Sequence, residues 1–366
     1  MKNVFIVKSP LQLLNAMEAR CHFELELNSS VLVIMGDKKS FPQMLSLMKE
    51  NNDWGMVFIL DNIPVFVRSK FLGHHENSSS IKTSLFKFQK SSFFSVFKLN
   101  KLAYFLKEAD YLFVGDNHNP LMRHFINKLK HKKTVLLDDG VGAVYMASIR
   151  KERHHTTPNI KLKKKIKLLA KRIFQGLNDM QADNLSFFSA YHLDLSEQDE
   201  LIYNDYRCLN NNRKSLERTN DVYFLGTPFS EVGIMSEGDY LRQLNMVREK
   251  YVNQVFVYIS HRRENSDKLK KIKNDMGVEV VAFDYPIEYQ LAMIGPVPKV
   301  LTSFVTSALE NLRIIMRDDL KIIAYRLIDG SYSIKDRIDS IYDSYEKNEG
   351  DFFYTESLCD SLKKSS

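Results

Sequence analysis

The sequence predicts an α/β protein of two Rossmann-like domains, each with a parallel β-sheet that faces a central cleft. Short apolar runs alternate with longer helical stretches over residues 1–140 and again over 220–330, which is the order expected of strand–helix units. The chain also has 366 residues, more than one hydrophobic core usually organises. We therefore expect two domains joined by a linker.

The first series contains four apolar runs expected to be buried strands, with helices between them. The strands are expected at Val4–Val7, Val31–Met35, Tyr111–Val114 and Thr134–Leu137, and the helices at Leu11–Cys21, Gln43–Asn51 and Leu121–Lys130. The serine-rich stretch 77–97 shows neither the hydrophobic period of a strand nor that of a helix, and it is expected to be irregular. From 151 to 220 the sequence turns basic and then polar, which is typical of a connection between domains.

The second series repeats the same alternation. Strands are expected at Val222–Leu225, Gln254–Ile259, Val278–Phe283, Val300–Leu301 and Leu320–Tyr325, and helices at Tyr240–Tyr251, Ser266–Met276, from Ile287, and at Thr306–Met316. A closing helix at Ile334–Tyr345 is expected to pack back on the first domain. The domains are thus expected at 1–215, with the basic linker, and at 216–330, followed by 331–366. Two such domains around a cleft form the GT-B architecture.

Composition narrows the class of protein. Hydrophobic residues make up 44% and charged residues 27%, as in soluble globular proteins, and no apolar run reaches the ~20 residues that span a bilayer. The cysteines, Cys21, Cys208 and Cys359, are far apart and form no CxxC pair. We therefore expect neither a disulfide framework nor a zinc site, and a cytoplasmic location.

The formal net charge of +7 is concentrated in two basic clusters, 68–101 and 151–172. Nucleic acid, anionic lipid and an anionic glycan would all be attracted to such clusters, and a solvated basic helix explains them equally well. The sequence has no helix-turn-helix, zinc pattern or aromatic RNA-binding strand, which argues against a nucleic-acid partner.

Three loops at the ends of expected strands carry groups suited to chemistry, since open α/β sheets bind ligands at that edge. The first is Asp138-Asp139-Gly140. Two sheltered neighbouring carboxylates resist double ionisation, so one gains a raised pKa and can act as a base, and the glycine allows a tight turn. On its own, the tripeptide is better explained as an ordinary solvated turn.

The second loop is Ser260–Glu264, where His261 stands beside two arginines. A histidine and guanidinium groups at a strand end are suited to a phosphate, which the histidine could serve with a hydrogen bond or a proton. A surface turn whose histidine caps a helix is an equal alternative.

The third loop is the hydroxyl-rich stretch Leu301–Asn311, which contains Ser303, Thr306 and Ser307. Hydroxyl groups at a helix start cap its free N–H groups, and those N–H groups with the helix dipole also form an anion site. A simple cap is the more common use of such a motif.

Taken in order, these loops resemble motifs of bacterial sialyltransferases, especially the lipooligosaccharide sialyltransferases of glycosyltransferase family 52 and their polysialyltransferase relatives. That family carries an acidic-Asp-Gly motif, then a His-Pro motif, then paired Ser/Thr residues. This chain departs at Arg262, which replaces the proline and adds a positive charge. Further similarity lies in Lys8–Gln12, Leu225–Pro228, Tyr258–His261 and Pro286–Glu288.

The resemblance implies an inverting, metal-independent transfer of sialic acid from CMP-sialic acid to a terminal sugar, expected to be galactose, of a bacterial surface glycan such as lipopolysaccharide or capsule. It implies that Asp138 is the base and Asp139 orients the loop, although the choice between them stays open, and that His261 assists the departing phosphate. It also implies nucleotide contacts from Gly226, Arg262, Glu288, Ser303, Thr306 and Ser307, and sugar contacts from Ser9, Gln12 and Gly140.

Other partners and functions remain open on the sequence. The donor could carry another CMP-linked nonulosonic acid, Kdo or a UDP-hexose, and the chain could be a basic nucleic-acid-binding protein or a non-catalytic glycan-binding protein. No Asp-x-Asp metal motif is present, so no metal or other cofactor is expected. The cationic stretch 161–172 could hold the enzyme against anionic lipid, near a lipid-linked acceptor at the inner face of the inner membrane.

Overall fold

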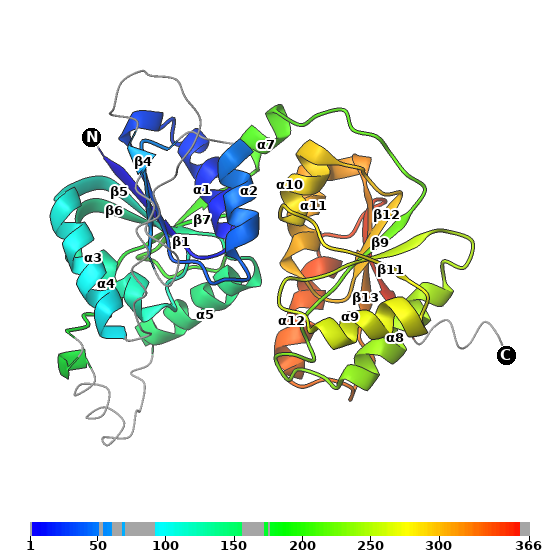
Figure 1. The fold of residues 1–366 in the computed structure, drawn as a ribbon. Helices are drawn as coiled ribbons and strands as arrows, with labels where there is room; N and C mark the ends of the chain where they lie inside the picture. Colours follow the sequence, from blue (N-terminus) through cyan, green and yellow to red (C-terminus); the bar gives the residue numbers. More distant parts are fainter. Residues whose placement is uncertain are drawn as a thin grey trace. The chain divides into compact units, whose positions relative to one another are not determined.

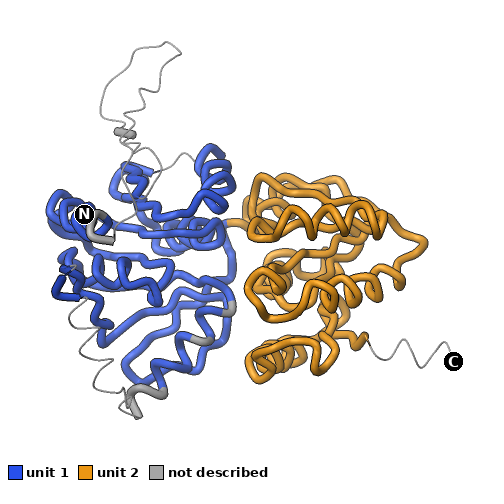
Figure 2. The backbone as a smooth tube through the Cα atoms, turned by 60° about the horizontal axis from the view of Figure 1, so that its bottom comes forward, with its two compact units in different colours: residues 1–208 blue, residues 209–366 orange. Residues whose placement is uncertain are grey.

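The computed structural model describes residues 2–50, 54–60, 68–69, 92–155, 172–174 and 176–358. The chain forms two compact units, Met1–Cys208 and Leu209–Ser366, drawn in blue and orange in Figure 2. Each unit has its own sheet with helices on both faces (Figure 1). The prediction of an α/β chain with two parallel sheets is confirmed.

The first sheet has eight strands in the order β4-β3-β2-β1-β5-β6-β7-β8, all parallel except the short antiparallel β4. The chain runs outward from β1 on one side and from β5 on the other, so the carboxyl ends of β1 and β5 form a topological switch point. The strands are β1 Asn3–Val7, β2 Ser30–Ile34, β3 Met56–Ile59, β4 Arg68–Ser69, β5 Glu108–Val114, β6 Lys130–Leu137, β7 Ser186–Ser189 and β8 Glu200–Tyr203.

Every residue of β1 is buried, because both faces of the sheet are covered. Val4 and Ile6 point into a core shared with α3 and α4, while Phe5 stacks on Phe113 of β5 on the opposite face. Ser9 then caps α1 by accepting a hydrogen bond from the Gln12 amide. The helices are α1 Pro10–His22, α2 Phe41–Glu50, α3 Ser92–Leu106, α4 Pro120–Lys128, α5 Val141–His155 and α7 Arg207–Asn211.

The second sheet is fully parallel in the order β11-β10-β9-β12-β13-β14. Its switch point lies between β9 and β12, from which the strand order runs outward on both sides. The strands are β9 Val222–Leu225, β10 Phe256–Ile259, β11 Glu279–Val281, β12 Val300–Ser303, β13 Lys321–Arg326 and β14 Phe353–Ser357, and the helices are α8 Glu237–Glu249, α9 Ser266–Asp275, α10 Ile287–Tyr289, α11 Ser307–Met316 and α12 Lys335–Glu346.

Two stretches expected to lack regular structure contain elements of the first unit. Helix α3 covers the end of the stretch 77–97, of which residues 77–91 lie outside the described residues. Strands β7 and β8 lie within 151–220 and extend the first sheet, so this region is more than a linker. Most of the basic stretch 161–172 is outside the described residues. Strands β7 and β8 follow each other with no helix between them, so they break the strand–helix alternation on which the prediction rested.

The closing helix, expected to pack back on the first domain, is α12, and it is part of the second unit. Helix α12 packs in the second unit, where the Tyr342 hydroxyl donates to the Tyr325 carbonyl (2.8 Å) and the Tyr345 hydroxyl donates to the Thr306 carbonyl (2.8 Å). Strand β14 then pairs with β13 and completes the second sheet.

Cys21 and Cys208 form a disulfide between α1 and α7, with their Cα atoms 6.5 Å apart. The expectation of unpaired cysteines is therefore wrong for this pair, because a sequence separation of 187 residues leaves no spacing pattern to read. Cys359 lies outside the described residues. Among the described helices, none has the length and apolar character needed to cross a bilayer.

Candidate functional site

Asp138 directly follows β6 and is buried within a ring of hydrogen-bond donors. Its side chain is 1% exposed, and it accepts hydrogen bonds from the Gly140 amide (2.7 Å), the Ser189 hydroxyl (2.8 Å) and the Ala190 amide (3.2 Å). Burial raises the pKa of Asp138 to about 7, against the opposing effect of these donors. Both carboxylate oxygens are thus used to hold the loop together.

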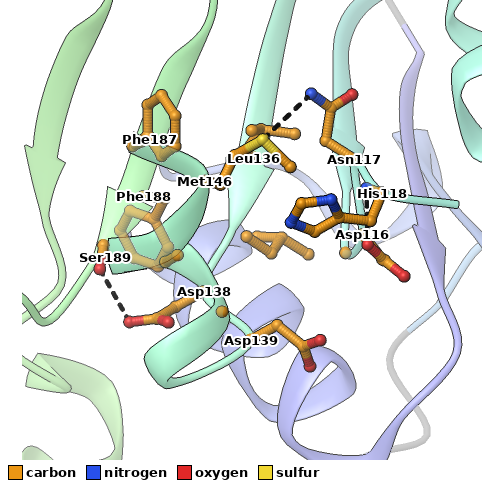
Figure 3. Close-up of a pocket in the computed structure, with 14 residues that line it drawn as sticks. Asp116, Asn117, His118, Leu136, Asp138, Asp139, Met146, Phe187, Phe188 and Ser189 are labelled. Carbon is orange, nitrogen blue, oxygen red and sulfur yellow. Dashed lines mark hydrogen bonds between the residues drawn. The ribbon is translucent and has the colours of Figure 1, made fainter. Parts of the chain in front are cut away.

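Asp139 lies in a different environment. Figure 3 shows its carboxylate pointing away from Asp138 and from Ser189. The side chain is exposed to solvent, yet protein atoms crowd much of its surroundings. This desolvation and the charge of Asp116 raise the pKa of Asp139 to about 6, while Gln12 and Lys8 oppose the rise. A carboxylate of this kind is accessible and titrates near neutrality, as a general base requires.

The first strand–helix turn supports Asp139. The Ser9 hydroxyl donates to Asp139 Oδ1 at 3.3 Å. Gln12 is fully buried, and its Oε1 accepts from the Lys8 amide at 2.8 Å, so it supports the turn and is not open to a sugar. Gly115 is required opposite it, because a Cβ there would lie 2.2 Å from Gln12 Oε1. Gly140 has a φ of 73°, which favours glycine and lets the loop turn after the acidic pair.

The sequence-based reasoning missed a charged pair at the first switch point. Lys8, after β1, forms an ion pair with Asp116, after β5. Asp116 also accepts from the His118 amide at 2.7 Å, and His118 lines the pocket beside the acidic loop (Figure 3). The signal was available, because Asp116 and His118 directly follow an expected strand, as Asp138 does.

In the second unit, His261 follows β10 and is held as a neutral imidazole. Burial, with the positive charges of Arg262 and Arg263, lowers the pKa of His261 to about 3. Its Nδ1 accepts a hydrogen bond from the Arg263 amide at 3.2 Å, which assigns the proton to Nε2. His261 can therefore donate a hydrogen bond through Nε2, whereas a proton transfer from an imidazolium is disfavoured near neutral pH.

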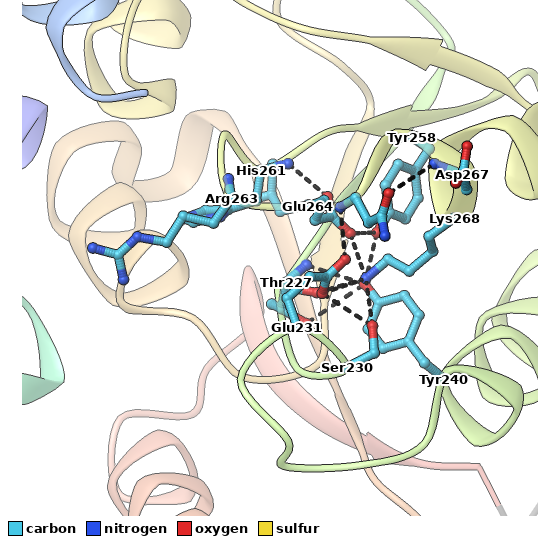
Figure 4. A network of polar contacts seen from close by, with 12 residues as sticks. Thr227, Ser230, Glu231, Tyr240, Tyr258, His261, Arg263, Glu264, Asp267 and Lys268 are labelled. Atoms are coloured by element: carbon cyan, nitrogen blue, oxygen red, sulfur yellow. Dashed lines mark hydrogen bonds and ion pairs between the residues drawn. The ribbon is translucent and has the colours of Figure 1, made fainter. Parts of the chain in front are cut away.

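A buried polar network fixes the loop that carries His261 (Figure 4). Glu264 accepts from the His261 amide (2.7 Å) and from the Tyr258 hydroxyl (2.6 Å), and it lies 2.8 Å from the Lys268 ammonium. The Lys268 ammonium also donates to the Thr227 carbonyl (3.2 Å) and lies 4.1 Å from the centre of the Tyr240 ring. Lys268 thus ties the loop after β9 to the loop after β10.

Gly226 is part of the same packing. A Cβ at this position would lie 2.4 Å from Glu264 Oε2 and 2.5 Å from the Tyr258 hydroxyl oxygen. The residue is therefore a glycine because the network beneath the loop leaves no room for a side chain. Sequence reasoning missed Glu264 and Lys268, since Lys268 sits in the lysine-rich helix α9, whose other lysines look the same in a charge pattern.

The hydroxyl-rich loop divides into a buried and an accessible part. Ser303 is fully buried and its hydroxyl donates to the Leu225 carbonyl at 2.7 Å, so it joins β12 to β9 and does not reach a ligand. Thr306 caps α11 by accepting from the Ala308 amide, and Ser307 begins the helix. The Tyr345 hydroxyl accepts a hydrogen bond from the Thr306 amide and donates one to the Thr306 carbonyl. The half-buried Thr306 and Ser307 stand at a helix N-terminus beside the switch point.

Glu288 links α10 to α11. It is 4% exposed, and it accepts from the Asn311 amide group at 2.9 Å. Burial raises the pKa of Glu288, and the positive charge of Arg262 opposes this rise. Arg262 and Glu288 are thus close enough to interact electrostatically. Among the residues that the structure describes, no group of three or more His, Cys, Asp or Glu side chains is arranged to hold a metal ion.

Comparisons with known proteins identify the fold. No family model matches the chain, and no curated protein matches its sequence. A 2,6-sialyltransferase from Photobacterium sp. JT-ISH-224, solved with CMP and lactose, is similar in structure, with a TM-score of 0.51 at 12% identity over 98% of this chain and 78% of that one. Two further structures superpose less closely. They are MnaA of S. aureus with UDP (TM-score 0.48, 13% identity, 96% and 88% covered) and the spinosyn rhamnosyltransferase SpnG with thymidine diphosphate (0.40, 11%, 100% and 88%).

The chain has the GT-B fold. At 12% identity, this similarity concerns the fold.

Proposed function

We propose that the protein is an inverting, metal-independent glycosyltransferase that moves sialic acid from CMP-sialic acid to a terminal galactose of a bacterial surface glycan. The observation that carries this proposal is a pair of complementary switch points. The first unit presents an accessible carboxylate with a pKa of about 6, and the second presents a neutral histidine after β10 and a helix N-terminus after β12. A base and a phosphate-binding site are the two parts that such a transfer needs.

Asp139 serves as the base in this proposal, in place of Asp138. A base must reach the acceptor hydroxyl, and Asp138 is buried with both oxygens already accepting hydrogen bonds. Asp139 is exposed, and Ser9 orients it by donating to Oδ1. Asp138 and Gly140 shape the loop, and Gln12 supports the turn from below.

The second unit binds the nucleotide end of the donor. His261 donates a hydrogen bond from Nε2 to a phosphate oxygen, and the amides at the start of α11, with Thr306 and Ser307, bind the same phosphate. Arg262 adds positive charge, and the buried Glu288 acts indirectly, by joining α10 to α11 through Asn311. Gly226 and Ser303 act indirectly, since they shape the floor of the site.

The proposed transfer is a direct displacement at the anomeric carbon. The acceptor oxygen attacks the anomeric carbon while Asp139 takes its proton, and a new C–O bond forms on the face opposite the leaving group. The bond between the anomeric carbon and the phosphate oxygen breaks, and CMP departs with the electron pair. A departing monophosphate carries less negative charge than a diphosphate. We therefore assign its stabilisation to hydrogen bonds, the Arg262 guanidinium and the dipole of α11.

Two lines support the choice of CMP-sialic acid. The order of Asp138-Asp139-Gly140, His261 and Thr306-Ser307 resembles bacterial sialyltransferases. The similar structure from Photobacterium is a sialyltransferase bound to CMP and lactose. The acceptor is proposed to be linked to lipid at the inner face of the inner membrane, because the enzymes that the chain resembles modify lipooligosaccharide.

A donor panel tests the proposal. The full chain is incubated with lactose and, in turn, CMP-sialic acid, CMP-Kdo, UDP-glucose and UDP-galactose, with and without EDTA, and the released nucleotide and glycosylated lactose are measured. We expect sialyl-lactose from CMP-sialic acid at a rate that EDTA does not change. Transfer from a UDP-hexose only, or a rate abolished by EDTA and restored by Mg²⁺, would contradict the assigned donor or the assigned mechanism, respectively.

A further inference from the structure

The outer surface of α3 carries aromatic side chains where a surface helix usually carries polar ones. Phe97 is 50% exposed, Tyr104 87% and Phe105 57%. The opposite side of the helix, with Leu99 and Leu102, is buried in the core of the first unit. A helix that is apolar on both sides, yet lies on the surface of its unit, has one face that its own fold does not use.

The exposed side of α3 combines these rings with positive charge. Phe97, Lys101 and Tyr104 follow the i, i+4, i+7 spacing of one helix face, and the Lys101 ammonium lies 4.6 Å from the centre of the Phe97 ring. Lys98 and Lys101 are the charged residues of α3, which contains no acidic residue. The face is therefore both aromatic and cationic.

A neighbouring segment has the same character. Ile173 is 71% exposed and Phe174 87%. The chain that follows them is tied to α4, since the Asn127 side chain donates to the carbonyls of Asn178 (3.2 Å) and Met180 (2.9 Å). Helix α4 in turn packs on α3. The sequence 161–172, just before Ile173, has seven basic and no acidic residues.

We propose that this aromatic–basic face of α3, formed by Phe97, Lys98, Lys101, Tyr104 and Phe105, binds the surface of an anionic lipid bilayer. Aromatic rings are favoured at the boundary between headgroups and acyl chains, and lysines beside them pair with anionic headgroups while their stems lie along apolar surface. Each lysine near an anionic bilayer adds to the attraction. The inference goes beyond the transfer reaction and does not depend on which donor is used.

A second copy of the chain and the chain's own stretch 70–91 are two other partners for this face, and charge argues against both. In a symmetric pair of chains, this face of one copy would meet the same face of the other, so positive charge would meet positive charge. The stretch 70–91, which precedes α3 in the chain, contains four lysines and one glutamate, so it too carries the same sign as the face. An anionic bilayer is complementary to both the charge and the aromatic content.

Vesicle binding by the full chain tests the inference. We expect the chain to sediment with vesicles of equal phosphatidylcholine and phosphatidylglycerol, less so in high salt, and weakly with phosphatidylcholine alone. The double variant Phe97→Ser/Tyr104→Ser should bind the mixed vesicles about tenfold more weakly or worse. Lys98→Gln and Lys101→Gln should each lose about fivefold. A matched control, Val252→Ser/Val255→Ser, alters side chains that are 77% and 56% exposed in the second unit and should bind as the parent chain does.

A fluorescence readout covers the case in which the serine variant does not fold. The chain has one tryptophan, Trp54, which is 8% exposed, so Tyr104→Trp adds a second emitter on the face itself. Its emission should shift to the blue when mixed vesicles are added. Unchanged vesicle binding by the serine variant, or an unshifted Tyr104→Trp emission with bound vesicles, would overturn the inference. A blue shift that depends on protein concentration without vesicles would overturn it in favour of a second copy.

Discussion

Asp138 and Asp139 are adjacent residues with different roles, because one side chain points inward from the loop and the other points outward. Asp138 accepts three hydrogen bonds from Gly140, Ser189 and Ala190, and these donors would otherwise be buried without a partner. Asp139 accepts a hydrogen bond from Ser9, interacts with Gln12 and is open to solvent. Stability should therefore depend on the first residue and catalysis on the second.

Thermal unfolding of two alanine variants separates these roles. Asp138→Ala removes the acceptor for three buried donors and should lower the free energy of unfolding by about 2–4 kcal/mol. Asp139→Ala removes an exposed carboxylate and its contacts with Ser9 and Gln12, and it should change the Tm much less. A Tm loss for Asp139→Ala as large as that for Asp138→Ala would show that both carboxylates are structural.

The pH dependence of transfer reports on Asp139. As the pH rises through about 6, Asp139 loses its proton and becomes able to accept one, so kcat/KM should rise through this range and level off above it. His261, with a pKa lowered to about 3, should add no second step between pH 5 and pH 8. A rate that falls as the pH rises from 5 to 7 would require a group that acts in its protonated form, and it would contradict this assignment.

At the scale of elements, two loops of the second unit are held in place by groups that touch no substrate. The network of Glu264, Lys268, Tyr258 and Tyr240 lies under the loops after β9 and β10. Its buried ion pair is protected from water, so the loss of one partner leaves an uncompensated charge. The position of His261 should therefore depend on residues in α9 and α8.

Two lysines of α9 provide a matched comparison. Lys268→Met leaves buried Glu264 without its cation and should lower the free energy of unfolding by about 3 kcal/mol and weaken CMP binding in titration calorimetry. Lys270→Met alters a side chain that is 71% exposed and pairs with Asp267, so both quantities should stay at their parent values. Equal effects of the two substitutions would argue against a supporting role for Lys268.

Two glycines test the packing beneath the same loops. Gly226→Ala would place a Cβ 2.4 Å from Glu264 Oε2, and the displaced network should lower the free energy of unfolding by about 1–3 kcal/mol. Gly238→Ala, in α8, would meet only Ser236 Oγ at 3.9 Å and should be neutral or stabilising. Denaturant unfolding measures both. A Gly226→Ala protein as stable as its parent would mean that the polar network can shift to make room for the methyl group at no cost in stability.

At the scale of the whole molecule, sequence periodicity was enough to find the central strands and their helices. The strands next to both switch points are buried runs bounded by turns, and the expected positions of β1, β5, β9 and β13 lie within a few residues of the observed ones. Regions whose pattern is weak were missed. Helix α3 is apolar on nearly all sides and has little helical period, and β7 and β8 follow each other without the helix that separates the predicted strands.

The candidate site was predictable in position but not in detail. The rule that ligands bind at the carboxyl ends of parallel strands located the loops at Asp138, His261 and Thr306. It could not show which side chains point outward, so Ser303 and Gln12 were expected to contact ligands although both are fully buried. Burial and hydrogen-bond partners come from contacts between distant parts of the chain, which no local pattern contains.

The central claim is that one residue of each unit takes part in the same transfer: Asp139 takes the proton of the acceptor hydroxyl, and His261 donates a hydrogen bond to the phosphate of the donor. The most direct test measures kcat for transfer from CMP-sialic acid to lactose with the parent chain, Asp139→Asn and His261→Asn, at saturating substrates, alongside CMP affinity. We predict that each variant loses about 10²-fold or more in kcat, and that Asp139→Asn binds CMP as tightly as the parent. A parent-level kcat in either variant would contradict the claim, because the unit that carries the altered residue would then have no part in the chemistry.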